Sequence, residues 1–201
     1  YVSFDPTVNW ARKKRSIPPP PKDEDIEALL ADLHNYEPVT QYLVKFMLLC
    51  GLRTKEALSV KLEDISDNGW LTVVAAKGGR IRYFPIYKFP ELVALVEEIK
   101  RNISKNGYLF GEKYTNSLAT SIRARASRRK TWVNGFHAFR KYRENELIKL
   151  GYSDKTIAQL WGHSPTIQRS VYLSEDIVKH ELDNQLPDNI ISGVKIHQKS
   201  S

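Results

Sequence analysis

Apolar residues recur at intervals of three and four over most of the chain, the spacing that gives an amphipathic helix one buried face. Asp23 or Asp25 can cap the first such segment at its N-terminus. Pro38 suits the first turn of the second segment, and Gly51 suits its left-handed C-terminal cap. The pattern predicts helices within residues 23–33, 38–50, 54–58, 90–99, 117–130, 136–150, 155–161, 165–172 and 175–186.

Two runs of β-branched and aromatic residues interrupt the helical pattern. They are Trp70–Ala76 and Ile81–Ile86, and the sequence K-G-G-R lies between them. Gly-Gly accepts the positive φ angles of a tight turn, so the two runs predict a β-hairpin with Lys77 at its tip. The predicted fold class is therefore α+β, mainly α-helical with a small antiparallel sheet.

The chain divides into three segments by composition. Residues 1–21 combine a basic cluster with four consecutive prolines and predict a semi-rigid, extended linker. Residues 22–186 carry the periodic apolar pattern and predict one domain with its own core. Residues 187–201 lack this pattern and predict a flexible C-terminal tail.

Positive charge is concentrated in one part of the sequence. The chain has a net charge of +8, and nine Lys or Arg residues with no Asp or Glu lie between Lys113 and Arg143. A clustered basic segment is typical of nucleic-acid binding, although a solvated helix face can have the same composition. We expect the DNA contacts among Arg123, Arg125, Arg128, Arg129, Lys130, Lys141 and Arg143.

Cys50 is the only cysteine, which excludes an internal disulfide and a cysteine-based metal cluster. No apolar run approaches the ~18 residues of a membrane span, and no signal-peptide pattern opens the sequence. We expect a soluble, cytoplasmic protein that associates with the host nucleoid and not with a membrane.

Candidate chemistry is concentrated in residues 135–172. His137 and Arg140 stand one helical turn apart, and Tyr172 follows His163 by nine residues. A tyrosine phenol has a pKa of about 10, so at neutral pH it attacks well only where cations surround the reacting centre. Arginine can neutralise the non-bridging oxygens of a phosphoryl group, and histidine or lysine can transfer the protons. The pattern indicates phosphoryl transfer with a tyrosine nucleophile, although satisfied core histidines would give part of it.

Two further cations lie outside that stretch. Arg53 occupies the turn between two predicted helices, where an ordinary surface arginine would pair with Glu56. Lys77 occupies the hairpin tip, where a lysine is usually only solvated. Neither residue indicates a site alone, but together with the histidines and Arg140 they suit a negatively charged transition state. The set contains no paired carboxylates and no metal-ligand spacing.

These motifs resemble the catalytic domain of the tyrosine recombinase (phage integrase) family over residues 22–185. Two departures are visible: Lys141 stands where the family often has histidine, and Trp161 stands where leucine is usual. Neither departure removes a catalytic group. The matched positions are Gly51, Leu52, Arg53 and Glu56 in a G-L-R-x-x-E box, Lys77 in the hairpin, His137 and Arg140 in an H-x-x-R box, Gly162 and His163 in a G-H box, and Tyr172.

The resemblance implies an enzyme that cuts and rejoins double-stranded DNA at specific sites, without a metal or nucleotide cofactor. Arg53 and Arg140 would clamp the scissile phosphate. His137 and His163 would hydrogen-bond to it, with His137 also a candidate base. Lys77 would protonate the 5′ leaving oxygen.

The resemblance also implies the remaining roles and the partners. Tyr172 would form a 3′-phosphotyrosine that the 5′-hydroxyl of a second strand resolves, and Glu56 would orient Arg53. Family members usually recombine as tetramers that exchange C-terminal segments, so residues 175–186 are a candidate exchange segment. The sequence is similar to integrases of viruses and plasmids, archaeal ones included, and such a protein would act in DNA integration by a mobile element.

Two alternatives keep the DNA partner but change the activity. A type IB topoisomerase uses the same chemistry and relaxes DNA without a partner site. A non-catalytic helix-turn-helix module would account for the basic charge and for the segment S-D-K-T-I-A-Q-L-W-G-H-S at residues 153–164. The second alternative gives no role to Arg53, Lys77 or Tyr172.

Overall fold

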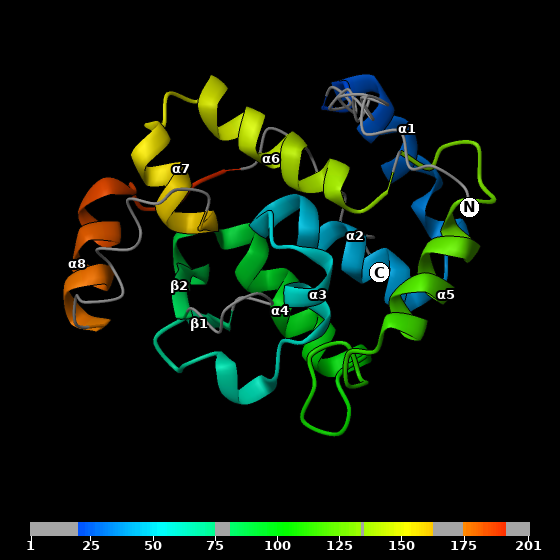
Figure 1. The fold of residues 1–201 in the computed structure, drawn as a ribbon, viewed down its shortest axis with the longest axis horizontal. Coiled ribbons are helices and arrows are strands. Elements are labelled where there is room, and N and C mark those ends of the chain that lie inside the picture. The colour runs from blue at the N-terminus through cyan, green and yellow to red at the C-terminus, as the bar shows by residue number, and fades with distance from the viewer. Residues whose placement is uncertain (1–19, 75–80, 134, 163–174, 192–201) are drawn as a thin grey trace, which may run out of the picture.

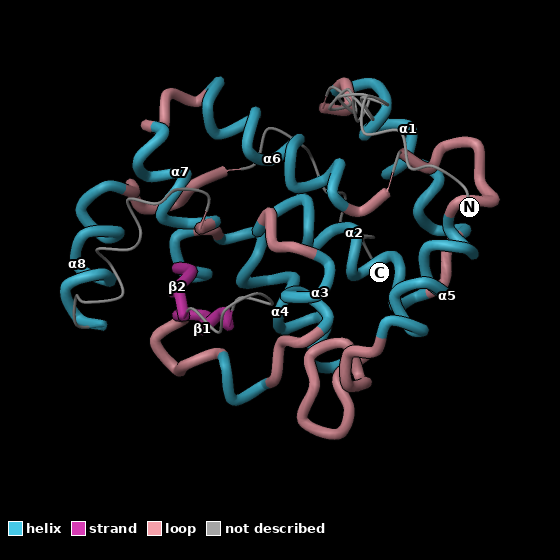
Figure 2. The backbone as a smooth tube through the Cα atoms, viewed as in Figure 1, coloured by secondary structure: helices cyan, strands magenta, loops and turns pink. Residues whose placement is uncertain are grey.

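The computed structural model of the chain describes residues 20–74, 81–133, 135–162 and 175–191. Helices dominate this part, and two short strands form one antiparallel sheet (Figure 1; Figure 2), which confirms the predicted fold class. No helix in these ranges is both long enough and apolar enough to cross a membrane. The elements are α1 (Asp23–Asp32), α2 (Pro38–Cys50), α3 (Thr54–Leu58), β1 (Trp70–Val74), β2 (Ile81–Pro85), α4 (Pro90–Asn102), α5 (Asn116–Ala126), α6 (His137–Lys149), α7 (Asp154–Trp161) and α8 (Glu175–Gln185), with short 3-10 turns at Leu33–Asn35, Leu62–Asp64 and Ile86–Lys88.

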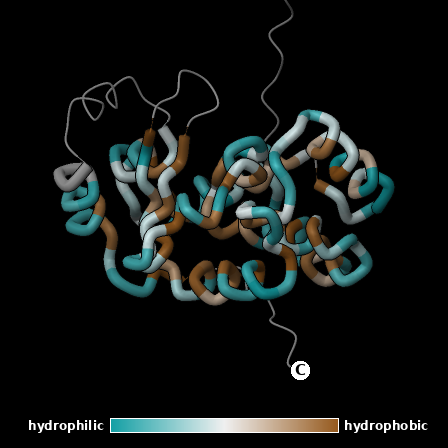
Figure 3. Tube along the Cα trace, turned by 90° about the horizontal axis from the view of Figure 1, so that it is seen from below, coloured by the Kyte–Doolittle hydropathy of each residue, from teal (hydrophilic) through white to brown (hydrophobic). Residues whose placement is uncertain are grey.

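Helix α2 lies at the centre of the core. It packs against α4 and α6, and Leu43, Phe46 and Met47 on it are completely buried. Pro38 opens the helix as predicted, and Gly51 ends it with a φ of 63°. Brown and teal alternate along the helices in Figure 3, as expected of amphipathic helices with one face in a shared core.

The two strands form the predicted hairpin. Trp70 pairs with Pro85, and Val74 pairs with Ile81, in antiparallel register. Helices α7 and α8 pack against β2, so the sheet lies between the helical core and the C-terminal helices. The predicted tip with Lys77 lies outside the described residues.

Helix starts depend on local caps. Arg53, and not Thr54, is the N-cap of α3, and the Glu56 carboxylate accepts the Arg53 backbone N–H at 2.9 Å. Thr115 caps α5, which ends at Ala126 and not at Lys130. Ser153 caps α7, since its hydroxyl accepts the Thr156 N–H at 3.2 Å.

The chain after α8 returns to the body of the protein. Ile190 is buried, and its N–H donates to the Lys88 carbonyl at 2.7 Å. The Lys88 ammonium pairs with Asp188 at 2.7 Å. Residues 187–190 therefore differ from the predicted flexible tail, because a buried isoleucine and an ion pair attach them. Residues 192–201 and most of the predicted linker, 1–19, lie outside the described residues.

Candidate active site

A buried carboxylate, that of Glu56, organises one side of the site. Its side chain is fully buried, and it accepts a hydrogen bond from Arg53 Nη1 at 2.9 Å. Arg82 donates to both of its oxygens, at 3.0 and 2.6 Å. Burial alone would raise the pKa of Glu56, but the hydrogen bonds and charges of Arg82 and Arg53 outweigh it and lower the pKa to about 2. Glu56 is thus an anion that holds two guanidinium groups.

Arg53 differs from the other arginines of this cluster because its side chain is 43% exposed. Its position at the start of α3 fixes the backbone, and Glu56 fixes one edge of the guanidinium. The exposed remainder of the guanidinium faces solvent. An arginine held in this way can bind an anion without losing much side-chain entropy.

Arg140 joins two helix ends that are distant in sequence. Its side chain is buried, and its guanidinium donates to the Gly51 carbonyl at 3.0 Å and to the Trp161 carbonyl at 2.8 Å. Burial, together with the charges of Arg53 and Arg82, lowers the pKa of Arg140 to about 9, so it remains a cation at neutral pH. The neighbourhood is electropositive.

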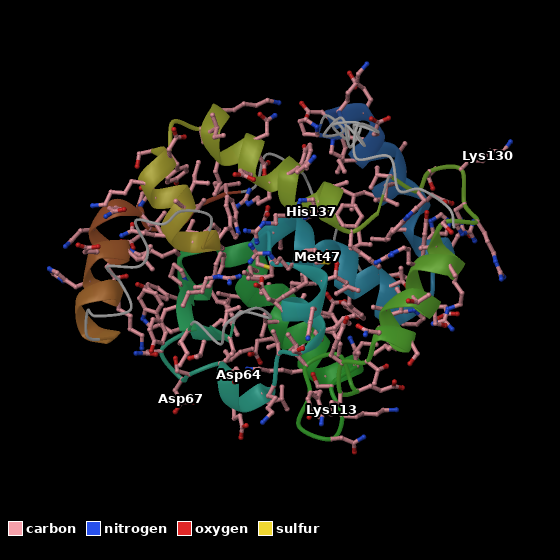
Figure 4. All side chains as sticks on the ribbon, in the orientation of Figure 1. Met47, Asp64, Asp67, Lys113, Lys130 and His137 are labelled. Atoms are coloured by element: carbon pink, nitrogen blue, oxygen red, sulfur yellow. The ribbon has the colours of Figure 1, made fainter. Side chains whose placement is uncertain are left out.

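His137, labelled in Figure 4, opens α6 one turn before Arg140, and α6 packs against α2. It is exposed to solvent. Partial desolvation of its otherwise exposed ring, together with the charges of Arg140, Lys141 and Arg53, lowers the pKa of His137 below its ordinary value of 6.5. The imidazole is therefore neutral at pH 7 and can either accept or donate a hydrogen bond.

The end of α7 is fixed against the end of α2. The Trp161 indole is buried and donates to the Cys50 carbonyl at 2.8 Å. Gly162 follows in the left-handed conformation with a φ of 68°. Three of the predicted catalytic residues, Lys77, His163 and Tyr172, lie outside the described residues. The structure therefore brings together Arg53, Glu56, His137 and Arg140 of the predicted set.

Arg82 belongs to this cluster, and the sequence analysis did not select it. It lies on β2 in the inward phase, two residues before the buried Phe84. An arginine in phase with a buried aromatic residue is a signal for a satisfied buried charge, because the faces of a strand alternate residue by residue. The sequence therefore signals that Arg82 is buried, but it does not identify the partners of Arg82.

The predicted DNA contacts of α5 and the following turn lie on the surface. Arg123, Arg128 and Lys130 are exposed, and Lys130 extends at the periphery in Figure 4. Arg125 is exposed but pairs with Glu37 at 2.9 Å. Arg129 donates to the Asn35 carbonyl at 2.7 Å, which fixes it against α1. These residues make one basic surface with differing local restraints.

The prediction for Arg143 as a DNA contact is wrong. Its side chain is completely buried, its Nε donates to the Leu49 carbonyl at 3.0 Å, and its Nη1 donates to Glu146. The physical reason is helical spacing: Arg143 follows Arg140 by three residues and shares its inward face. Lys141, between them, is half-buried and stays a predicted DNA contact.

Comparison with known proteins agrees with this geometry. The model of the "Phage integrase family" matches residues 22–176. The tyrosine recombinase XerA of Pyrococcus furiosus is 24% identical over 190 residues, which cover 89% of this chain and 66% of XerA. The tyrosine recombinase XerH of Campylobacter jejuni subsp. jejuni is 27% identical over 199 residues, which cover 89% of this chain and 55% of XerH.

The fold is also found among solved structures. The catalytic core of lambda integrase superimposes with a TM-score of 0.59 at 17% identity, over 74% of this chain and 93% of that core. The chain thus spans about two thirds or less of the curated relatives named above but nearly all of an isolated catalytic core. With a family match over most of its length, this chain belongs to the phage integrase family of tyrosine recombinases.

Proposed function

We propose that this chain cleaves and rejoins DNA strands as the catalytic domain of a site-specific recombinase. One observation carries the proposal: Arg53, His137 and Arg140, which come from α3 and α6, form one electropositive cluster around the anchored Glu56. Such a cluster suits a phosphodiester, whose transition state places negative charge on the non-bridging oxygens. A DNA backbone supplies that group.

The chemistry proceeds by two transesterifications. The Tyr172 oxygen attacks the scissile phosphorus, the bond to the 5′ oxygen breaks, and Lys77 gives that oxygen its proton. The phenol proton passes to a base, for which neutral His137 is the candidate. Arg53 and His163 hold the phosphate, and so does Arg140 after its guanidinium, which is buried in this structure, becomes exposed. A second strand's 5′-hydroxyl then attacks the 3′-phosphotyrosine and releases the tyrosine.

Double-stranded DNA and further copies of the chain are the proposed partners. A solved XerH structure is bound to its difH substrate, and a lambda integrase tetramer is bound to a Holliday junction. By analogy we expect a tetramer on DNA at the host nucleoid, with α8 as the exchanged segment. Here α8 docks on its own chain: Gln159 donates to Glu181 at 2.9 Å, and Thr156 donates to Gln185 at 3.1 Å. Exchange requires these contacts to break and re-form between copies.

The same contacts weigh against a helix-turn-helix module. In such a module the second helix must present its polar side chains to the major groove. Thr156 and Gln159 of α7 are instead bonded to α8. The basic surface of α5 and the cluster near Arg53 together suit a DNA-cleaving domain better.

The test is covalent capture of the chain on a pool of nicked duplexes with randomised sequence. Cleavage near the nick releases a short DNA fragment, and once that fragment has diffused away the strand cannot be rejoined, so the covalent adduct accumulates. The wild-type chain should become linked to a 3′ end, and peptide mapping should locate the link at Tyr172. Tyr172→Phe should fold and bind DNA but form no adduct, because only the hydroxyl is missing. Tyr152→Phe, a half-buried tyrosine outside the cluster, is the matched control and should still form one.

Three outcomes would contradict the proposal. If Tyr172→Phe still forms an adduct, Tyr172 is not the nucleophile. If the wild-type chain forms no adduct with any duplex of the pool, the proposed cleavage activity is wrong. The wild-type chain could also relax supercoiled plasmid while its adducts show no preferred sequence among the duplexes of the pool. That result would identify a relaxing enzyme and not a site-specific recombinase.

A further inference from the structure

Arg82 uses its whole guanidinium group in a buried position beside the cluster. The residue is 8% exposed. Its Nη1 and Nη2 donate to the two oxygens of Glu56 at 3.0 and 2.6 Å, and its Nε donates to the Leu160 carbonyl at 3.1 Å. One side chain on β2 thus connects the α3 carboxylate to the last turn of α7.

The two-oxygen contact determines how Glu56 is oriented. A bidentate arginine–carboxylate pair fixes the plane of the carboxylate, which a single contact from a lysine does not. The fixed Glu56 oxygens then accept the side chain and the backbone N–H of Arg53, both at 2.9 Å. The orientation of Arg53 therefore depends on Arg82 through Glu56.

The charge of Arg82 also decides how strongly Glu56 holds Arg53. With Arg82 present, the buried carboxylate has two cations and shares its negative charge between them. Without Arg82, the buried carboxylate would keep Arg53 as its one ion-pair partner among the described residues. That carboxylate would draw the Arg53 guanidinium inward, away from the solvent that it now faces.

The third donor extends the same frame to α7. The Leu160 carbonyl belongs to the final turn of the helix, and Gly162 lies beside Arg82, since a Cβ there would be in ordinary van der Waals contact with Arg82 Cδ and Nη1 at 3.9 Å. His163 is the next residue in the sequence. Movement of Arg82 would therefore shift the point from which the chain continues to His163.

We propose that Arg82 is a positioning residue that fixes Glu56 so that Arg53 presents its exposed edge to the scissile phosphate, and that holds the end of α7 in the same frame. The proposal rests on the proposed function for its catalytic consequence. Its structural half concerns Arg53 and Glu56 alone and can be tested without DNA.

The catalytic test measures single-turnover cleavage of a trapped duplex by Arg82→Lys, which retains the positive charge. The rate should fall about 10²-fold, the effect of a small misplacement of a catalytic group, while DNA affinity changes little. Arg101→Lys, at an exposed position on α4, is the matched control and should cleave as the wild type does. In an Arg53→Ala background, Arg82→Lys should cost much less than in the wild-type background, because the part of its effect that passes through Arg53 is already lost.

A role in stability alone would give different results. The losses from Arg82→Lys and Arg53→Ala would then multiply, and that outcome would overturn the proposal, as would a wild-type rate in Arg82→Lys. If Arg82→Lys does not fold, the pair Glu56→Gln and Glu56→Gln/Arg82→Gln replaces it. The first variant removes the buried carboxylate, and the second removes both buried charges. A further loss of about 10²-fold in the double variant would also overturn the proposal, because the effect of Arg82 on Arg53 passes through Glu56.

A DNA-independent measurement separates this proposal from the proposed function. The guanidinium ¹⁵N–¹H signals of Arg53, assigned by their loss in Arg53→Lys, should be resolved in the wild-type chain and broadened in Arg82→Lys. If the wild-type chain forms no DNA adduct, the proposed function is wrong, but the Arg53 signals still show whether Arg82 positions Arg53. Unchanged Arg53 signals in Arg82→Lys would show that Arg82 does not position Arg53.

Discussion

The basic segment between Lys113 and Arg143 contains two groups of arginines with opposite environments. Arg123 and Arg128, on α5 and just after it, are exposed to solvent. Arg140 and Arg143, on α6, are buried and donate to the backbone carbonyls that end α2, those of Gly51 and Leu49. The same residue type therefore has two roles in this segment. The exposed arginines add to the positive potential of the surface, and the buried ones connect α6 to the end of α2.

The difference shows which physical cost each group carries. A buried guanidinium must have its N–H groups bonded and its charge balanced, so its removal disturbs several partners at once. An exposed arginine keeps its hydration and adds to the potential that attracts DNA, an effect that salt screens. Substitution should therefore change folding or catalysis on α6 and salt-dependent affinity on α5.

The largest expected effect is the destabilisation caused by Arg143→Met. This change leaves the Glu146 carboxylate without the guanidinium that now donates to it, and breaking a buried pair costs about 3–5 kcal/mol. Denaturant unfolding of both proteins measures the loss in the free energy of unfolding. Arg143→Met/Glu146→Met should recover much of the loss, and Arg128→Met, at the surface, should stay within about 0.5 kcal/mol. A loss that is equal for Arg143→Met and Arg128→Met would remove the distinction between the two groups.

The next effect concerns catalysis by Arg140. Arg140→Lys keeps a cation but cannot reproduce the contacts to Gly51 and Trp161 while also facing a phosphate, so cleavage should fall about 10²–10³-fold. Single-turnover cleavage at saturating protein measures this loss separately from binding. Arg123→Lys on α5 is the control and should leave the rate unchanged. A normal rate in Arg140→Lys would assign Arg140 to the frame alone.

The smallest effect is on DNA affinity. Arg123→Gln/Arg128→Gln should reduce the slope of log K against log salt concentration by about 2, because each lost phosphate contact lowers it by about 1. Binding titrations over a series of salt concentrations measure this slope. Arg125→Gln should change the slope less, since Arg125 already pairs with Glu37 at 2.9 Å. Equal slopes in all three proteins would mean that this surface does not contact DNA.

Local sequence signals predicted most of the fold. The spacing of apolar residues gave the helices, Pro38 and Gly51 gave the ends of α2, and the Gly-Gly turn gave the strand pair. These features depend on residues that are close together in the sequence, so a local sequence pattern is enough to predict them. The attachment of Ile190 to Lys88 could not be predicted in this way, because it depends on a contact across about one hundred residues.

The candidate site shows the same limit. Arg53, His137 and Arg140 were selected because they match motifs, and the structure places them together. Arg143 was misassigned because a count of charges does not distinguish the two faces of α6. Arg82 was missed because its importance depends on Glu56 and Leu160, which are 26 and 78 residues away.

The bond from the Trp161 indole to the Cys50 carbonyl spans 111 residues, and it has a consequence for synthesis of the chain. At about 5–20 residues per second, a ribosome needs roughly 6–22 seconds to make the residues between these two partners. During that interval Arg53 is already present, but the end of α7 that completes its surroundings is not. A nascent chain therefore carries the first arginine of the candidate site long before it can carry the whole of that site.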